Sequence, residues 1–424
     1  MRILLLASVY PPHEMESCQI YQAEVARGLE ARGHQCFVLT SRHTNWAPNG
    51  REGSERVRRS LFLTNHHGSN AHPSRLERLA MWQLGVERYD LAQFRHCLRE
   101  TLPDVLLAWQ IRTLPTSILL EAQARGLKTV YYVSDGELAQ PPAWWRAHTG
   151  KPRSGARGLA RGLSSQFVVR ALLPYDYAAE RPEPRYVVFS SRALLEDYRR
   201  RGLFTNGARV IYQGVPTPFE DERRVNHPDP RLPDLVFLGR VSYDKGVHNA
   251  LEAMAILVNE RDHRDLRLSI IGYPPDEEYD VRLKGLVARA GLDNNVFFLR
   301  GVPVERMAAL LASFDVLVYP SIEHEHSDLT PIEAMARGLA VVGTTVGLGE
   351  EFYVDGENVL TFVAGDAAGL ADRVEQLVWQ SELLRRLGQA GQRLVEQRFT
   401  MTRFLDEIED YLVRVVAEPE GTRV

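Results

Sequence analysis

Short runs of apolar residues alternate with helical stretches along nearly the whole chain, and the runs are continuous rather than alternating with polar residues. They are Ile3–Ala7, Cys36–Leu39, Val105–Trp109, Thr129–Val133, Tyr186–Phe189, Val210–Tyr212, Leu235–Leu238, Leu268–Ile271, Val296–Leu299, Val316–Tyr319 and Ala340–Val342. Continuous runs are typical of strands that helices cover on both faces. The helical stretches between them carry apolar stripes such as Tyr21, Val25 and Leu29. This repetition of strand and helix predicts parallel sheets and an α/β fold.

Prolines concentrate in the stretch 214–233, where five of them stand among charged residues. This composition predicts an interdomain linker. We therefore expect two doubly wound, Rossmann-like domains, 1–214 and 215–403, that face each other across a cleft. Ligands of such sheets bind outside the carboxyl ends of the strands, so the cleft is the expected site.

Composition and charge bear on the partners of the protein and on its cellular compartment. Lys and Arg total 51 and Asp and Glu total 55, so no basic excess points to nucleic acid as a partner. The three cysteines (Cys18, Cys36 and Cys97) are widely spaced, which favours a reducing cytoplasm over a disulfide framework or a structural zinc site. The apolar stretch 3–9 precedes Pro-Pro-His-Glu and is interpreted as a first strand rather than a targeting segment. We expect a cytoplasmic protein.

The segment 151–170 is rich in basic residues and follows Trp144 and Trp145. One interpretation is a solvated insertion with ordinary surface charge. The other is peripheral contact with anionic lipid at the inner face of the membrane, or with an anionic acceptor. Both interpretations stay open at this point.

A first cluster of candidate residues follows the run Leu235–Leu238. Gly239 ends that strand, Arg240 leaves the carboxyl edge of the sheet, and Lys245 with Gly246 opens the next helix. A helix N-terminus carries unpaired N–H groups and a partial positive charge. Two cations beside it predict a diphosphate site, although a surface Arg and Lys flanking a turn would leave the same pattern.

A second cluster follows the run Val316–Tyr319. Glu325 falls in the loop and Glu333 in the next helix. Thr330 before Pro331 suggests a helix N-cap, with Glu333 completing a capping box. A carboxylate also accepts hydrogen bonds from adjacent sugar hydroxyls, so the two glutamates are candidates to hold a ribose and a hexose. Amides of the loop from Ser327 through Asp328 and Leu329 to Thr330 are candidate donors to phosphate or sugar.

Two histidines, His324 and His326, flank Glu325 and raise the possibility of a metal. No further ligand cluster has suitable spacing, and the basic pair already supplies charge for a phosphate. We therefore expect no metal site and no cofactor, with a nucleotide sugar as substrate.

Taken together, these segments resemble glycosyltransferase family four, a group of retaining enzymes with the GT-B fold. The most specific matches are Gly239-Arg240 with Lys245-Gly246, and Glu325 with the segment Glu333-Ala-Met-Ala-x-Gly. The opening Met-Arg-Ile-Leu-Leu-Leu-Ala-Ser-Val-Tyr-Pro-Pro, the Gly33-His34 turn, Val188-Phe-Ser-Ser-Arg and Ile211-Tyr-Gln-Gly-Val resemble the family's N-terminal half.

The resemblance implies a role for each of these residues. Arg240 and Lys245 would stabilise the departing diphosphate, Glu325 would hold the donor sugar, and Glu333 would bind the ribose. The nucleotide would lie beside Gly239 and Gly272, with Val302 near its base. The last helix, about Phe404 to Val416, would cross back to the first domain, which is completed by 404–424.

Four segments depart from the family's pattern, and one of them is Val346-Gly-Leu-Gly-Glu-Glu, with an inserted Leu348, where Gly-Gly-x-x-Glu is usual. The loop after the first strand, residues 13–18, lacks the usual Gly-Gly pair, and Glu16 and Ser17 take the acceptor side there. Ser134 and Asp135 stand where a His-Asp pair is usual at the acceptor. Asp328 replaces a glycine, so an acid lies near the expected donor.

The resulting hypothesis is a retaining hexosyltransferase that uses a UDP- or GDP-sugar and a glycan or lipid-linked acceptor. The alternatives are a nucleotide-sugar epimerase or phosphorylase on the same fold, and a non-catalytic protein that binds sugar nucleotides. Placed in the cleft and not in a core, Lys245 is expected to matter for rate far more than for stability.

Overall fold

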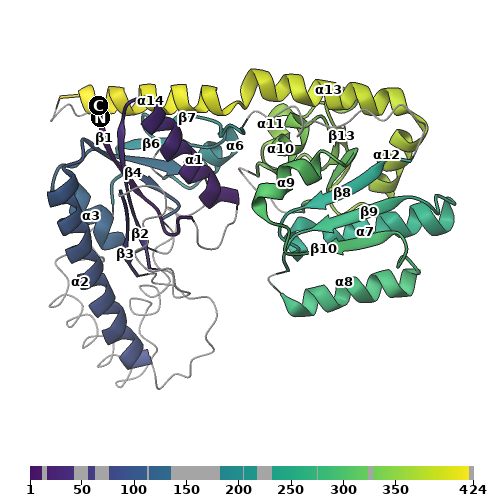
Figure 1. Ribbon diagram of the computed structural model, residues 1–424, viewed down its shortest axis with the longest axis horizontal. Helices are drawn as coiled ribbons and strands as arrows, with labels where there is room; N and C mark the ends of the chain where they lie inside the picture. Colours follow the sequence, from purple (N-terminus) through teal and green to yellow (C-terminus); the bar gives the residue numbers. More distant parts are fainter. Residues whose placement is uncertain are drawn as a thin grey trace. The chain divides into compact units, whose positions relative to one another are not determined.

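The structure is a computed structural model. It describes residues 1–11, 17–42, 56–62, 76–111, 114–134, 182–203, 205–216, 232–274, 276–322 and 328–419. The chain divides into two compact units, which are described separately here. Unit 1 comprises Met1–Phe189, Leu195–Ile211 and Leu405–Val424, and unit 2 comprises Ser190–Leu194 and Tyr212–Phe404. Each unit holds its own parallel sheet, coloured purple to blue and teal to green in Figure 1.

Unit 1 is built on a sheet in the order β3-β2-β1-β4-β5-β6-β7, and all neighbouring strands are parallel. Its elements are β1 Arg2–Leu6, α1 Ser17–Ala31, β2 Gln35–Ser41, β3 Val57–Leu61, α2 Leu76–Thr101, β4 Val105–Trp109, α3 Thr116–Ala124, β5 Thr129–Val133, β6 Tyr186–Phe189, α6 Arg192–Arg200 and β7 Arg209–Val210. The strand order reverses between β1 and β4. The carboxyl ends of these two strands therefore form the switch point where such sheets bind ligands.

Unit 2 repeats this plan with the order β10-β9-β8-β11-β12-β13. Its strands are β8 Asp234–Leu238, β9 Arg267–Ile271, β10 Val296–Leu299, β11 Val316–Tyr319, β12 Ala340–Gly343 and β13 Leu360–Thr361. Its helices are α7 Val247–Ala255, α8 Glu277–Ala290, α9 Val304–Leu311, α10 Thr330–Ala336, α11 Gly349–Phe352, α12 Ala367–Trp379 and α13 Ser381–Arg398. A 3₁₀ turn, η4 Tyr243–Lys245, precedes α7, and a π-helical turn, η5 Ile256–Glu260, follows it. The switch point lies between β8 and β11.

Successive strand residues of unit 2 face opposite cores, as a pleated strand requires. Phe237 and Val318 join the core covered by α7, α8 and α12. Val236 and Leu317 join the other core, which includes α10 and the end of α13. Both faces of the sheet are thus buried, which is the physical reason for its continuous apolar runs.

All eleven apolar runs contain strands, with ends that shift by at most a few residues. Two strands of the described residues were not predicted. In β3 the central Arg58 and Arg59 break the apolar pattern, and β13 is only two residues long. Both are edge strands, where one side needs no sheet partner and polar residues are tolerated.

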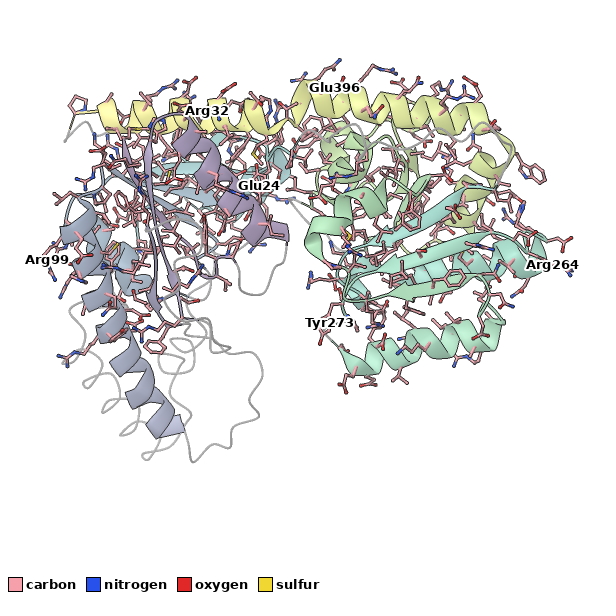
Figure 2. The ribbon with its side chains drawn as sticks, viewed as in Figure 1. Glu24, Arg32, Arg99, Arg264, Tyr273 and Glu396 are labelled. Atoms are coloured by element: carbon pink, nitrogen blue, oxygen red, sulfur yellow. The ribbon has the colours of Figure 1, made fainter. Side chains whose placement is uncertain are left out.

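The last helix, α14 Met401–Ala417, begins in unit 2 and continues into unit 1 from Leu405. Within unit 1 it packs on α1, where a Cβ on Gly28 would lie 2.4 Å from Leu405. Arg32, labelled in Figure 2, pairs with Asp406 at 2.6 Å. The helix thus completes unit 1, although it follows unit 2 in the sequence.

Candidate functional site

Two glycines let the backbone close tightly around the carboxyl end of β8. A Cβ on Gly272, which follows β9, would lie 1.8 Å from the carbonyl oxygen of Gly239. A Cβ on Gly246, whose φ is +66°, would lie 2.0 Å from the carbonyl oxygen of Pro320. Only glycine fits either position. The Gly246 contact brings the start of α7 against the end of β11, at the switch point of the sheet.

Lys245 ends η4 and is buried at this switch point, with 6 % of its surface exposed. Its Nζ contacts Oδ2 of Asp328, 83 residues later in the chain, and lies 5.8 Å from the centre of the Tyr319 ring. Tyr319 donates its hydroxyl to the same Asp328 oxygen at 3.0 Å. The two segments singled out in the sequence therefore meet through Lys245 and Asp328. Lys245 is buried, which corrects the premise that it lies in an open cleft and not in a core.

Opposing effects act on the pKa of Asp328. Burial raises the pKa of this carboxyl, but the Lys245 ammonium and the hydrogen bonds from Lys245 and Thr330 outweigh burial. The pKa of Asp328 therefore lies below its usual value, and the carboxylate stays ionised beside the ammonium. The site contains a desolvated ion pair rather than an isolated cation.

Arg240 differs from Lys245 in its surroundings. Its side chain is 53 % exposed and lies 3.3 Å from Oδ2 of Asp244, four residues later. Water screens such a pair, so it adds little to stability. The guanidinium is thus accessible at the same loop in which Lys245 is buried.

The expected capping box is wrong. α10 begins at Thr330, its N-cap is Leu329, and no side chain caps that position. Asp328, two residues before Thr330, instead accepts the Thr330 amide at 2.9 Å, which has no partner within the helix. Glu333 is therefore not the N3 residue of a capping box with Thr330 as its cap.

The remaining donor-side residues lie around the same sheet edge. Glu333 lies in the first turn of α10 and is partly buried. Val302 follows β10 and packs against a core of unit 2, as does Leu329. Tyr273, labelled in Figure 2, follows Gly272 and is 76 % exposed, so one exposed aromatic ring borders this loop.

Several predicted site residues lie outside the described residues: Glu325, Ser327, Asp135, Glu16, His324, His326 and the basic segment 151–170. Ser17 is the first residue of α1, and Ser134 is buried directly after β5. Within the described part of the chain, no group of three His, Cys, Asp or Glu residues could hold a metal ion. Among the described helices, none combines the length and apolar character that a membrane span requires.

Two buried polar atoms near Lys245 were missed by sequence reasoning. Oγ of Ser242 and Nδ2 of Asn249 have no hydrogen-bond partner among the described residues, and the two side chains belong to residues 9 % and 4 % exposed. Buried polar groups are normally satisfied, and exceptions concentrate at functional sites. Ser242 lies within the segment Arg240–Lys245 and Asn249 lies four residues after it, and this proximity in the sequence was the signal that could have identified them.

A polar cluster at the switch point of unit 1 was also missed. Gln110 follows β4 with φ of +52°, and its carbonyl accepts from Ser8 Oγ at 2.5 Å. Its side chain accepts from the fully buried Gln22 at 2.9 Å. Backbone strain of this kind in a non-glycine residue is concentrated at functional sites. A single sequence gives no signal for a positive φ at glutamine.

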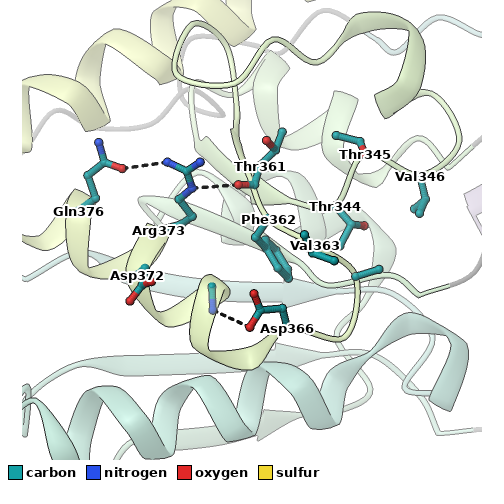
Figure 3. Close-up of a pocket in the computed structure, with 12 residues that line it drawn as sticks. Thr344, Thr345, Val346, Thr361, Phe362, Val363, Asp366, Asp372, Arg373 and Gln376 are labelled. Carbon is teal, nitrogen blue, oxygen red and sulfur yellow. Dashed lines mark hydrogen bonds between the residues drawn. The ribbon is translucent and has the colours of Figure 1, made fainter.

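A cavity of about 700 Å³ lies beyond β12 and β13, beside α12 (Figure 3). None of the predicted residues lines it. Its Arg373 already donates to the Thr361 carbonyl at 2.9 Å and to Asp355 at 2.7 Å, and its Asp366 accepts the Gly369 amide. Its charged groups are thus engaged within the protein, as are Lys245 and Arg240 at the switch point.

Comparison with known proteins finds a match to a family model within unit 2. Residues 218–394 match the family model of the glycosyl transferases group 1. The D-inositol 3-phosphate glycosyltransferase of Pseudarthrobacter chlorophenolicus is 36 % identical over 155 residues, which are 37 % of this chain and 36 % of that protein. The chain spans about a third to a half of the length of the first curated relatives that it matches.

Solved structures match over nearly the full chain. Sucrose-phosphate synthase from Thermosynechococcus elongatus has a TM-score of 0.69 at 20 % identity, over 98 % of this chain and 99 % of that chain. Anabaena HepE in complex with UDP has a TM-score of 0.67 at 16 % identity, over 98 % and 100 %; it is also solved with UDP-glucose. At these identities the likeness shows the fold alone. The chain thus has the GT-B fold that the sequence predicted, and its residues 218–394 carry the pattern of the glycosyl transferases group 1.

Proposed function

We propose that the protein is a retaining glycosyltransferase that moves a hexose from a nucleoside diphosphate sugar to an acceptor hydroxyl. The observation that carries this proposal is Lys245, a buried cation at the switch point of unit 2, beside two unsatisfied polar groups. The family match of the same unit supports a glycosyltransferase. HepE, a protein of the same fold, was solved with UDP and with UDP-glucose, which supports a UDP-sugar as the first donor to test.

In this proposal the enzyme stabilises the leaving group by charge. Lys245 and Arg240 contact the diphosphate as negative charge develops on it, which is the largest single contribution in many enzymes. The bond between the anomeric carbon and the phosphate oxygen breaks as the acceptor oxygen bonds to the same face of the sugar. The departing phosphate takes the proton of the acceptor hydroxyl. Glu333 holds the ribose hydroxyls, and Glu325 holds the hexose.

We assign the acceptor to unit 1. Ser8, Gln22 and Gln110 gather hydrogen-bonding groups at the switch point of that sheet. Hydroxyls of a glycan or of a lipid-linked sugar match these neutral polar groups in kind. Ser134, directly after β5, lies along the same carboxyl edge.

A panel of UDP- and GDP-sugars, assayed for release of nucleoside diphosphate, tests the activity. We expect one donor to be hydrolysed slowly without acceptor and faster with a suitable one. Proton NMR of the first sugar released from the preferred donor tests the stereochemistry, and the α-anomer is expected from an α-linked donor. Nucleotide binding without turnover across the whole panel would favour a non-catalytic protein, and the β-anomer would reject retention.

A further inference from the structure

Lys245 already has an anionic partner inside its own unit. The side chains of Lys245 and Asp328 are 7 % and 13 % exposed, and their charged atoms are in direct contact. Asp328 is also fixed from two other sides, by the hydroxyl of Tyr319 at 3.0 Å and the amide of Thr330 at 2.9 Å. It is therefore an ordered, poorly hydrated negative charge that touches the cation proposed to bind the diphosphate.

The second cation is paired as well, since Arg240 lies 3.3 Å from Asp244. Each of the two cations thus has a carboxylate partner. The two carboxylates nevertheless differ, because Asp244 belongs to an accessible pair that water screens, whereas Asp328 lies where screening is weak. Repulsion between a bound diphosphate and Asp328 is consequently the stronger of the two.

We propose that Asp328 is an internal counter-ion of Lys245 that weakens binding of the nucleoside diphosphate and thereby speeds the release of this product. The inference rests on the proposed function and deepens it. The Lys245 ammonium has three N–H donors, and the carboxylate occupies at least one of them. The diphosphate must share the cation with Asp328, so it is held less tightly than a lone buried ammonium would hold it.

A purely structural role for Asp328 makes the opposite prediction. If the carboxylate served only to hold Lys245 in position, its removal would displace the ammonium and weaken binding of the diphosphate. If it serves as a competing anion, its neutralisation strengthens binding. An uncharged nucleoside, which has no phosphate, is indifferent to the competing anion.

The test is calorimetric titration of the full chain with UDP and, separately, with uridine. Asp328→Asn and Asp328→Ser both remove the charge and keep an oxygen that accepts the Thr330 amide. We expect both variants to bind UDP at least about tenfold more tightly than the wild type. Uridine affinity stays unchanged, and the dissociation of UDP measured by stopped flow slows accordingly.

Asp366→Asn is the matched control. Asp366 also accepts an amide at the start of a helix of unit 2, from Gly369 at 2.9 Å, but it has no contact with Lys245 among its hydrogen bonds or ion pairs in the described residues. Its neutralisation should leave the affinity for UDP unchanged. A gain equal to that of the Asp328 variants would show a general charge effect and overturn the assignment.

Each remaining outcome is also decisive. Unchanged or weaker UDP binding in folded Asp328 variants overturns the counter-ion while leaving the proposed function intact. Unfolding of both variants at 25 °C overturns it too, because the carboxylate would then serve the fold. Absence of UDP binding in every protein, the wild type included, rejects UDP as the product and this inference with it.

Discussion

Replacing Lys245 by methionine removes the buried ammonium and leaves the Asp328 carboxylate without its cation. Loss of one partner from a buried ion pair costs about 3–5 kcal/mol, because the other charge stays desolvated. Asp328 keeps its hydrogen bonds from Tyr319 and Thr330. We therefore expect the lower end of that range, about 3 kcal/mol, which lowers the melting temperature of a unit of this size by about 6–12 °C.

Differential scanning calorimetry of the full chain measures this loss, and Arg240→Met is the matched control. Arg240 belongs to an exposed pair of the same loop, so its replacement should cost at most about 0.5 kcal/mol. A double-mutant cycle with Asp328→Asn should show that the two losses at the buried pair are not additive. If Lys245→Met costs no more than Arg240→Met, the buried pair does not form in solution and the reasoning is refuted.

Three further predictions concern other parts of the chain. Gly246→Ala should destabilise unit 2 in urea by more than Gly291→Ala, because both glycines have φ of +66° but only the first would place a Cβ against the Pro320 carbonyl; equal losses would contradict that close approach. Glu333→Ala should weaken UDP binding in a calorimetric titration through lost ribose contacts, and unchanged affinity would remove this role. Burial raises the pKa of Asp90 to about 8, so the folded state binds a proton that the unfolded state releases near pH 4. Unit 1 should therefore lose stability from about pH 4 to about pH 8, and Asp90→Asn should flatten this slope in melting curves; a slope of the same size in both proteins would contradict it.

Much of the fold was predictable because both faces of each sheet are buried. Strands such as β4 and β11 are apolar throughout, and a strand of this kind is visible in a single sequence. β3 and β13 were invisible because an edge strand needs neither continuous apolar character nor length. The packing of the folded unit, rather than the intrinsic strand preference of these residues, determines that β3 and β13 pair with their neighbouring strands.

The arrangement of the candidate site residues on the sheet edge was predictable in part. The strand ends and glycines placed Arg240 and Lys245 at the correct sheet edge, since parallel strands share one carboxyl edge. The pairing of Lys245 with Asp328 was not predictable, because a contact between residues far apart in the chain produces no periodic pattern in the sequence. The local pattern at α10 also favoured Thr330, rather than Asp328, as the capping residue. The strained Gln110 was hidden for the same reason, as tertiary contacts with Ser8 and Gln22 hold it.

The central claim is that a nucleoside diphosphate binds at the switch point of unit 2. Hydrogen–deuterium exchange with and without UDP tests it most directly. We predict slower exchange in residues 239–249 and 328–333, with little change in residues 361–376 beside the cavity of Figure 3. Protection confined to 361–376, or absent from both switch-point segments while UDP is bound, would contradict the account.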